Sequence, residues 1–387
     1  MPTVINGTTG ITTDGINATS GNTSLTTLNV ASNPISAVNS LGFRNRIING
    51  DMRIDQRNNG ASVTAGSGNV YSLDRWKMLY SVDNRFTVQQ QQNPTGIAFS
   101  ATAQITSSSA YSVGAGDIFA FQQAVEGFNV ADLKWGTAAA TTVTLGFWVN
   151  TSLTGTFGGS VMNSATNRSY PFTYAVSAAN TWEFKTVIIP GDTTGTWLTN
   201  NGVGLWLSFG LGGGSTFSGT AGAWTGSARY TATGAVSVVG TNGATFFITG
   251  VQLEAGTVAS PFERRDIGRE LMMCQRYYEK SYSQPVTPGA STPEGMVLMP
   301  TVDQASSQYA GVTQPFRAEK RASPTMAVWD VVGNLARTTL YSAGGLAQQN
   351  NNNNITNILG VTSSFYMILV TAGANFAAFQ WTASSEL

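Results

Sequence analysis

The fold is decided by residues 142–150, which read TVTLGFWVN. Apolar and polar side chains alternate along this stretch with a period of two, and a Thr-Ser turn follows it. This pattern predicts a β-strand. Strands of the same character are expected at three further places: residues 182–189, which end at Pro190-Gly191-Asp192, residues 204–209 and residues 245–251.

No helical period of useful length lies between Phe43 and Glu263. These residues, about 220 in all, are short strands separated by Gly, Asn, Thr and Pro turns, which predicts one β-sandwich of jelly-roll type over residues 43–264. The composition agrees. Charged residues are 10% of the chain, against a usual value of about 25%, and Gly is 43 of 387 residues. Low charge with frequent Gly, Thr, Ser and Asn favours an all-β fold over helices.

Charge and residue inventory exclude several classes of function. The chain has 20 basic and 20 acidic residues, so its sequence carries no signature for binding duplex nucleic acid or an anionic membrane surface. It has no His and one Cys, Cys274, which excludes an intrachain disulfide, His-dependent nucleophiles and Cys-clustered metal sites. We therefore predict no cofactor, no metal and no enzymatic activity.

The start, MPTVINGTTG, lacks the basic and apolar regions of a signal peptide. The longest apolar stretches, Val143–Val149 and Val203–Gly210, fall short of the roughly 18–20 residues that span a bilayer. We expect synthesis in a cytoplasm and no membrane insertion.

Residues 1–42 form a separate compositional block with no aromatic residue, no Lys, no Arg and one acid, Asp14. Isolated apolar residues are spaced there by Asn-Gly, Thr-Gly, Asp-Gly and Ser-Gly turn pairs. Such a segment cannot bury enough surface alone to offset its ordering entropy. A floppy terminus is one interpretation. We favour an extended arm whose short strands order against partner chains.

One helix is expected, from Asp266 to Lys280, with Asp266 as its N-cap. Its apolar positions are Ile267, Leu271, Cys274 and Tyr278. The helix either connects the sandwich to the next domain or packs against its copies on a symmetry axis. With Pro285, Pro288 and Pro293 it makes residues 265–294 a connecting helix and hinge.

Residues 295–387 predict a second, smaller β-domain. Its expected strands are Met296–Met299, Thr325–Trp329, Ser364–Thr371 and Phe376–Thr382. The low-complexity run Asn350–Asn354 is interpreted as a solvated hairpin tip, with a polar contact surface as the alternative.

Aromatic residues are the candidate ligand contacts, because Trp and Tyr faces stack on sugar rings. Trp148, Trp182 and Trp206 fall within expected strands and are assigned to the core. Trp197 and Trp224 fall in Gly- and Thr-rich loops with Tyr230 close behind, and these three are the predicted glycan-binding residues. The charged residues Arg57, Asp74, Arg75 and Glu263–Arg265 are expected to form ion pairs, within or between subunits, that fix the ends of the sandwich.

Several motifs resemble a widespread bacteriophage tail-fibre-like family, in order along residues 44–387. They are Arg46–Arg57, Leu73–Trp76, Phe147–Thr156, Asn180–Glu183, Ile189–Trp197, Phe247–Gly256, Pro261–Arg265, Cys274–Tyr278, Arg317, Ala322–Thr325 and Ser385–Leu387. The resemblance implies a receptor-binding structural protein of the virion, with a jelly roll similar to carbohydrate-binding modules. Such modules open near an Asn-Gly-Asp stretch and close on a strand like Ile248–Leu253, and many hold a structural calcium. Of the nearby acids only Asp51 and Glu254 could serve, and no calcium site is predicted.

The resemblance leads us to expect a homotrimer that is attached to other virion proteins through residues 1–42 and contacts a host-surface glycan. Two alternatives stay open. One is a purely architectural virion protein, such as a head fibre, decoration or collar subunit, without a ligand. The other is a glycan-degrading enzyme, which would need two carboxylates flanking the scissile bond. The acids are scattered and no such pair stands out.

Overall fold

The computed structural model describes residues 28–30, 33–35, 43–66, 70–300, 308–342, 345–352, 355–370 and 374–387. The chain divides into two units, residues 1–42 and residues 43–387. In the first unit, β1 (Leu28–Val30) pairs with β2 (Asn33–Ile35) in antiparallel fashion. The rest of the predicted arm lies outside the described residues.

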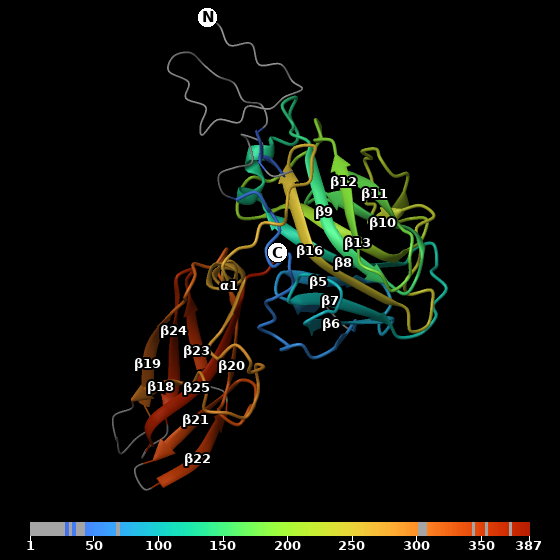
Figure 1. The fold of residues 1–387 in the computed structure, drawn as a ribbon. Coiled ribbons are helices and arrows are strands. Elements are labelled where there is room, and N and C mark those ends of the chain that lie inside the picture. The colour runs from blue at the N-terminus through green and yellow to red at the C-terminus, as the bar shows by residue number, and fades with distance from the viewer. Residues whose placement is uncertain are drawn as a thin grey trace, which may run out of the picture. The chain divides into compact units, whose positions relative to one another are not determined.

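Two six-stranded antiparallel sheets build a β-sandwich (Figure 1). In spatial order, the first sheet holds β11 (Ser169–Val176), β10 (Gly155–Met162), β13 (Val203–Gly213), β8 (Ile118–Glu126), β5 (Trp76–Tyr80) and β4 (Val70–Leu73). The second holds β12 (Glu183–Ile189), β9 (Val143–Thr151), β16 (Thr245–Ala255), β7 (Ala101–Ser107), β6 (Phe86–Gln92) and β3 (Val63–Thr64). Two 3₁₀ turns, η1 (Gly127–Asn129) and η2 (Ala131–Leu133), follow β8, and β14 (Ser218–Gly219) pairs in parallel with β15 (Thr231–Ala232).

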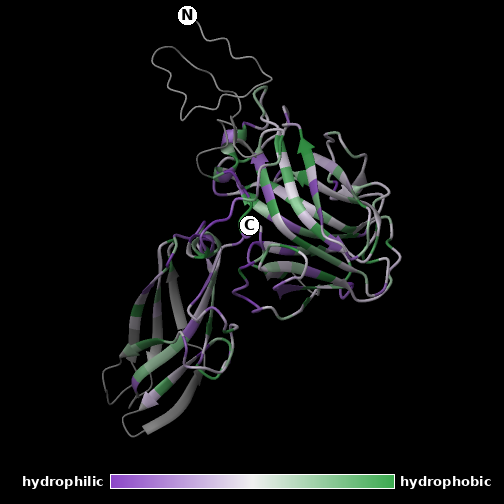
Figure 2. Cartoon of the chain, in the orientation of Figure 1, coloured by the Kyte–Doolittle hydropathy of each residue, from purple (hydrophilic) through white to green (hydrophobic). Residues whose placement is uncertain are grey.

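One face of each sheet points into a shared core, and hydropathy changes from residue to residue along the strands (Figure 2). In β9 the core residues are Val143, Leu145, Phe147 and Val149, each with no exposed surface. The Phe147 ring lies edge-on to Phe209 of the other sheet, with centroids 5.0 Å apart. Burying a side chain of this size stabilises the fold by roughly 2–3 kcal/mol. The all-β sandwich with a single helix, as predicted, is confirmed.

The core assignment of three tryptophans is wrong. Trp148 and Trp206 occupy the strand positions between the core residues, so both point to the outer faces of their sheets and are half-buried. Trp182 is also half-buried, just ahead of β12. Alternation along a strand fixes which residues share a face, but the strand's packing decides which face is buried.

The helix is shorter than expected. α1 spans Ile267–Gln275, and the Asp266 carboxylate caps it by accepting hydrogen bonds from the backbone N–H of Gly268 and Arg269. The expected helical end, Tyr278–Lys280, is instead strand β17, which pairs with Ser384–Thr382. The four expected apolar positions therefore do not form one buried stripe. Tyr278 lies outside the helix, and within it Cys274 is buried whereas Ile267 is half exposed.

The C-terminal residues form two more sheets. In the larger one, β25 (Ala374–Ser384) is central: β18 (Val297–Pro300) and β21 (Arg337–Ser342) pair with its first half, and β17 and β20 (Thr325–Trp329) with its second, while β22 (Gly345–Asn352) extends β21. The smaller sheet has the order β19 (Gln308–Pro315), β24 (Ser363–Val370) and β23 (Ile355–Leu359). Tyr366 and Phe379 join the two sheets, with ring centroids 4.7 Å apart.

The asparagine run is not wholly a hairpin tip. Residues 350–352 belong to β22, and residues 353–354 lie outside the described residues. The predicted domain boundaries at residues 264 and 294 stay predictions. β17, which lies inside the expected connecting segment, contributes to the C-terminal sheet.

Buried ion pairs tie the C-terminal residues to the sandwich. Glu386 accepts hydrogen bonds from Arg57 (3.0 Å) and from Arg75, and Arg57 also pairs with Asp74 at 3.2 Å. The Arg75 guanidinium stacks 3.5 Å above the Tyr277 ring. The predicted pairing of Arg57, Asp74 and Arg75 is confirmed within this chain, and of the residues Glu263–Arg265, Arg265 pairs with Glu263 at 3.4 Å. This junction gathers pieces of four motifs that are distant in sequence.

Candidate functional site

The second sheet of the sandwich carries a row of amide and aromatic side chains on its outer face. We call this surface the amide–aromatic face. It comprises Trp148, Trp182, Phe184 and Phe247, the amides Asn150, Gln104 and Gln89, and the threonines Thr245, Thr106, Thr87 and Thr64.

Strand register places these residues side by side. Asn150 of β9 is opposite Phe247 of β16, which is opposite Gln104 of β7, which is opposite Gln89 of β6. The next row is a ladder of four threonines, Thr245, Thr106, Thr87 and Thr64. Because paired residues of neighbouring strands point to the same side, the two rows form one continuous polar surface.

Aromatic rings line the other end of the same face. Trp148 and Phe184 are a cross-strand pair with ring centroids 5.4 Å apart, and Phe184 is 44% exposed. The Trp182 ring lies edge-on to Phe247 at 6.4 Å, and its Nε1–H donates to the carbonyl of Thr95 at 3.0 Å. The rings are therefore held in place while part of their surface reaches solvent.

The side-chain amides of this face are held by hydrogen bonds to their neighbours but do not use all of their donors and acceptors. Gln89 Nε2 donates to Gln104 Oε1 at 3.0 Å, and Gln104 Nε2 donates to Thr106 Oγ1 at 3.3 Å. A side-chain amide can donate two hydrogen bonds and accept two, so these contacts leave capacity for a ligand. Aromatic surface beside amides and hydroxyls is the combination that a sugar's apolar ring face and hydroxyl groups require.

The predicted residues Trp197 and Trp224 lie together in a cluster with Trp135, with ring centroids 4.7–5.5 Å apart and edge-to-face geometry. All three indole N–H groups donate to backbone carbonyls, those of Thr194, Pro190 and Thr141 respectively. Both predicted tryptophans are half-buried. This tryptophan cluster packs three loops against one another.

A salt bridge supports the same loops. Arg168 donates to both carboxylate oxygens of Asp192, at 2.7 and 2.8 Å. Burial raises the pKa of Asp192, but the hydrogen bonds from Arg168 and Thr194 outweigh that effect and hold it below its usual value.

Tyr230 makes its ring contact elsewhere, with Phe217 at 5.7 Å, and burial raises its pKa. The structure thus brings Trp197 and Trp224 together but gives Tyr230 a different ring partner. The glycan-binding role of all three stays a prediction. The sequence reasoning missed Phe184, Phe247, Gln89 and Gln104. The alternation of residues 182–188, in which every second residue is Trp182, Phe184, Thr186 or Ile188, was the available signal.

The two acids considered for calcium are both engaged by other groups of the chain. Gly50 has no room for a side chain because it lies against Val251 of β16, so the Asn-Gly-Asp stretch does meet the closing strand. However, Asp51 pairs with Arg53, and both oxygens of Glu254 accept hydrogen bonds from Ser260. In the part of the chain that the structure describes, no three acidic, His or Cys side chains gather to hold a metal.

No helix among the described residues is long and apolar enough to cross a membrane.

Comparison with known proteins gives structural likenesses only. No protein-family model matches the sequence, and no curated protein matches it. Among solved structures, the enzymatically active domain of tailspike protein 4 of bacteriophage CBA120 is 14% identical, with a TM-score of 0.29 over 55% of this chain and 21% of that one.

Two carbohydrate-binding modules are similar at the same level. TmCBM61, solved in complex with β-1,4-galactotriose, is 12% identical with a TM-score of 0.26, over 49% of this chain and 100% of the module. The N-terminal cellulose-binding domain of Cellulomonas fimi β-1,4-glucanase C is 13% identical with a TM-score of 0.24, over 48% and 90%. This chain thus spans about a fifth of the tailspike domain and nearly all of each module.

Proposed function

We propose that the chain is a non-enzymatic receptor-binding subunit of a bacteriophage virion, of the tail-fibre type, and that it contacts host-surface glycan through the amide–aromatic face. The observation that carries glycan binding is the unbroken row from Asn150 through Phe247 and Gln104 to Gln89 beside the half-exposed Trp148–Phe184 pair. The virion role is supported by the motifs that resemble the tail-fibre-like family. Trimer formation and attachment through residues 1–42 are part of the same proposal.

The face suits a chain-like neutral glycan. Its rows run across four strands, and neighbouring strands are about 4.8 Å apart, so successive sugar rings could lie over successive side chains. Weak contacts of this kind gain strength when several copies bind one surface.

The test is binding of the purified full chain to a panel of immobilised bacterial surface polysaccharides. We expect saturable binding to at least one, and a loss of about fivefold in affinity for Phe184→Ala and for Gln104→Ala, since a stacking contact and a hydrogen bond each contribute on the order of 1 kcal/mol. Phe128→Ala is the matched control, because Phe128 is 61% exposed on η1, away from this sheet. Trp197→Ala and Trp224→Ala test the residues predicted from sequence. Binding to no polysaccharide, or equal binding by all variants, would contradict glycan recognition here.

One observation favours the architectural alternative. Ile188, which is 53% exposed, follows Phe184 on the same face of β12, and an aliphatic side chain offers a sugar no stacking surface. Phe184 and Ile188 together form an exposed apolar surface, which is also suited to contact with another protein. If Phe184→Ala and Ile188→Ser lower the oligomeric state measured by light scattering and leave polysaccharide binding unchanged, the architectural role replaces the proposed one.

A further inference from the structure

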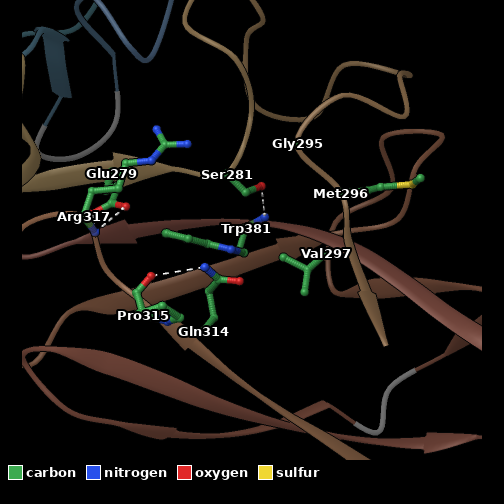
Figure 3. Close-up of a pocket in the computed structure, with 9 residues that line it drawn as sticks. All are labelled: Glu279, Ser281, Gly295, Met296, Val297, Gln314, Pro315, Arg317 and Trp381. Atoms are coloured by element: carbon green, nitrogen blue, oxygen red, sulfur yellow. Dashed lines mark hydrogen bonds between the residues drawn. The ribbon is translucent and has the colours of Figure 1, made fainter. Parts of the chain in front are cut away.

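The C-terminal sheets contain a cavity of about 230 Å³ where β17, β18, β19 and β25 meet (Figure 3). β17 pairs with β25 at residues 382–384 and β18 at residues 376–379, so Gln380 and Trp381 fall between the two strands. The backbone N–H of Trp381 donates there to the hydroxyl of Ser281 at 3.0 Å. The backbone N–H of Ser281 in turn donates to the carbonyl of Trp381 at 2.9 Å, so a single residue of the next segment continues the pairing beyond β17.

One buried donor in the cavity wall has no partner. Trp381 is 2% exposed and packs edge-on against Phe316, with ring centroids 5.7 Å apart. Its Nε1–H makes no hydrogen bond within the described residues. A buried, unpaired N–H group destabilises the fold, and a hydrogen bond to a ligand oxygen at this position would remove that cost.

Two residues of opposite charge line the cavity, Glu279 and Arg317. Glu279, 1% exposed, accepts hydrogen bonds from the backbone N–H of Arg317 at 3.0 and 3.2 Å and forms an ion pair with the buried Lys320. The Arg317 guanidinium is exposed at the cavity and has neither an ion pair nor a side-chain hydrogen bond in the described part of the chain. Because Lys320 balances the charge of Glu279, the Arg317 guanidinium is the unbalanced charge among the described residues that line the cavity.

The remaining wall is mixed. Gln314 Nε2 donates to the carbonyl of Pro315 at 3.1 Å, which leaves the amide oxygen available to accept, and Met296 supplies apolar surface. Drug-sized ligands occupy pockets of roughly 300–1,000 Å³, so this cavity suits a single small ring. A guanidinium forms its strongest paired hydrogen bonds with a carboxylate.

We propose that this cavity binds one acidic monosaccharide residue, a uronic acid or similar sugar, with its carboxylate on Arg317 and a ring or hydroxyl oxygen on Trp381 Nε1–H. The site is separate from the amide–aromatic face and would give the chain a second, charge-selective sugar contact.

The test is saturation-transfer NMR titration of the full chain with sodium glucuronate, with glucose and acetate as comparison ligands. We expect saturable glucuronate binding, and weaker binding of both glucose and acetate. Arg317→Gln and Trp381→Phe should each weaken glucuronate binding by about tenfold, a change of ~1.4 kcal/mol. Trp381→Phe keeps the aromatic packing and removes only the N–H donor. Arg269→Gln is the matched control, because Arg269 is an exposed arginine on α1.

The two variants distinguish a specific sugar site from simple charge attraction at the surface. An effect of Arg317→Gln without one of Trp381→Phe would reduce the site to surface charge attraction and overturn the proposal. Absence of saturation, or equal binding of glucose, would also overturn it. Because Arg317 is exposed, Arg317→Gln should fold normally. Glucuronate binding can therefore be measured in that variant even if Trp381→Phe fails to fold. Phe184→Ala should leave glucuronate binding unchanged, which distinguishes failure of this proposal from failure of the proposed glycan-binding face.

Discussion

Glu386 is the counter-charge of two arginines, the half-buried Arg57 and the buried Arg75. Replacing Glu386 with Gln removes the negative charge and leaves Arg75, 1% exposed, without its ion pair. We expect the free energy of unfolding to fall by about 3–5 kcal/mol. This is the usual cost of removing one partner of a buried ion pair, because the other charge is left uncompensated. Urea unfolding followed by tryptophan fluorescence measures it. Glu319→Gln, at an exposed glutamate, is the control and should change little. A loss for Glu386→Gln as small as the control's would contradict this role.

Asp74 gives the same junction a pH dependence. Burial raises its pKa to about 6 despite the opposing effect of Arg57. A carboxyl whose folded pKa exceeds its unfolded value near 4 takes up a proton first in the folded state, so its contribution to stability grows as pH falls from 6 to 4. Burial raises the pKa of Asp55 as well, which acts in the same direction.

We therefore expect Asp74→Asn to flatten the slope of unfolding free energy between pH 6 and pH 4, by up to ~3 kcal/mol over the window. The variant loses charge pairing with Arg57 and will be less stable at pH 7, so the slope and not the absolute value is the readout. Equal slopes for both proteins in urea titrations at pH 4.5 and 6.5 would contradict the assignment.

At the scale of elements, α1 depends on its cap. The Asp266 carboxylate is the first-turn acceptor for two backbone N–H groups, at 2.9 and 3.1 Å. Asp266→Ala should lower stability by about 1 kcal/mol, whereas Asp266→Asn keeps an acceptor and should cost less. The midpoint of urea unfolding compares the three proteins. If the alanine and asparagine variants behave alike, the cap is not what stabilises this helix.

Local pattern predicted the elements that need no distant partner to be recognised. Residues 142–150 and 245–251 became β9 and β16 because alternation alone marks a strand. Tyr278–Lys280 was wrongly placed in a helix because its strand partner, Ser384–Thr382, is over one hundred positions away, and no local signal announces it.

The candidate site was harder to predict than the strands, because its residues also come together only through pairing between distant parts of the sequence. Trp197 and Trp224 were selected because they fall in loops, and those loops turned out to pack on each other through Trp135. Phe184 was visible as an alternating residue, but the side it faces is fixed only when β12 pairs with β9. A row such as Phe247–Gln104–Gln89 exists only after three strands are in register.

At the scale of the whole molecule, residues 43–387 form one unit that holds all three buried hydrophobic clusters found among the described residues. Deleting residues 1–42 should therefore leave the melting temperature of the remainder unchanged, as calorimetry would show. We further predict that the shortened protein no longer joins virions. Incorporation at the level of the full chain would contradict the attachment role, and a lower melting temperature would show that the arm stabilises the rest.

The pairing of Arg75 with Glu386 also sets an order of events during synthesis. The two residues are 311 positions apart. A ribosome adds roughly 5–20 residues per second, so Arg75 emerges on the order of tens of seconds before its partner exists. Throughout that interval Arg75 of the nascent sandwich lacks its carboxylate partner, and the junction closes only after Glu386 has been synthesised. A nascent chain that stops before Glu386 would keep an unpaired buried guanidinium, so the sandwich reaches its full stability only after that residue has been added.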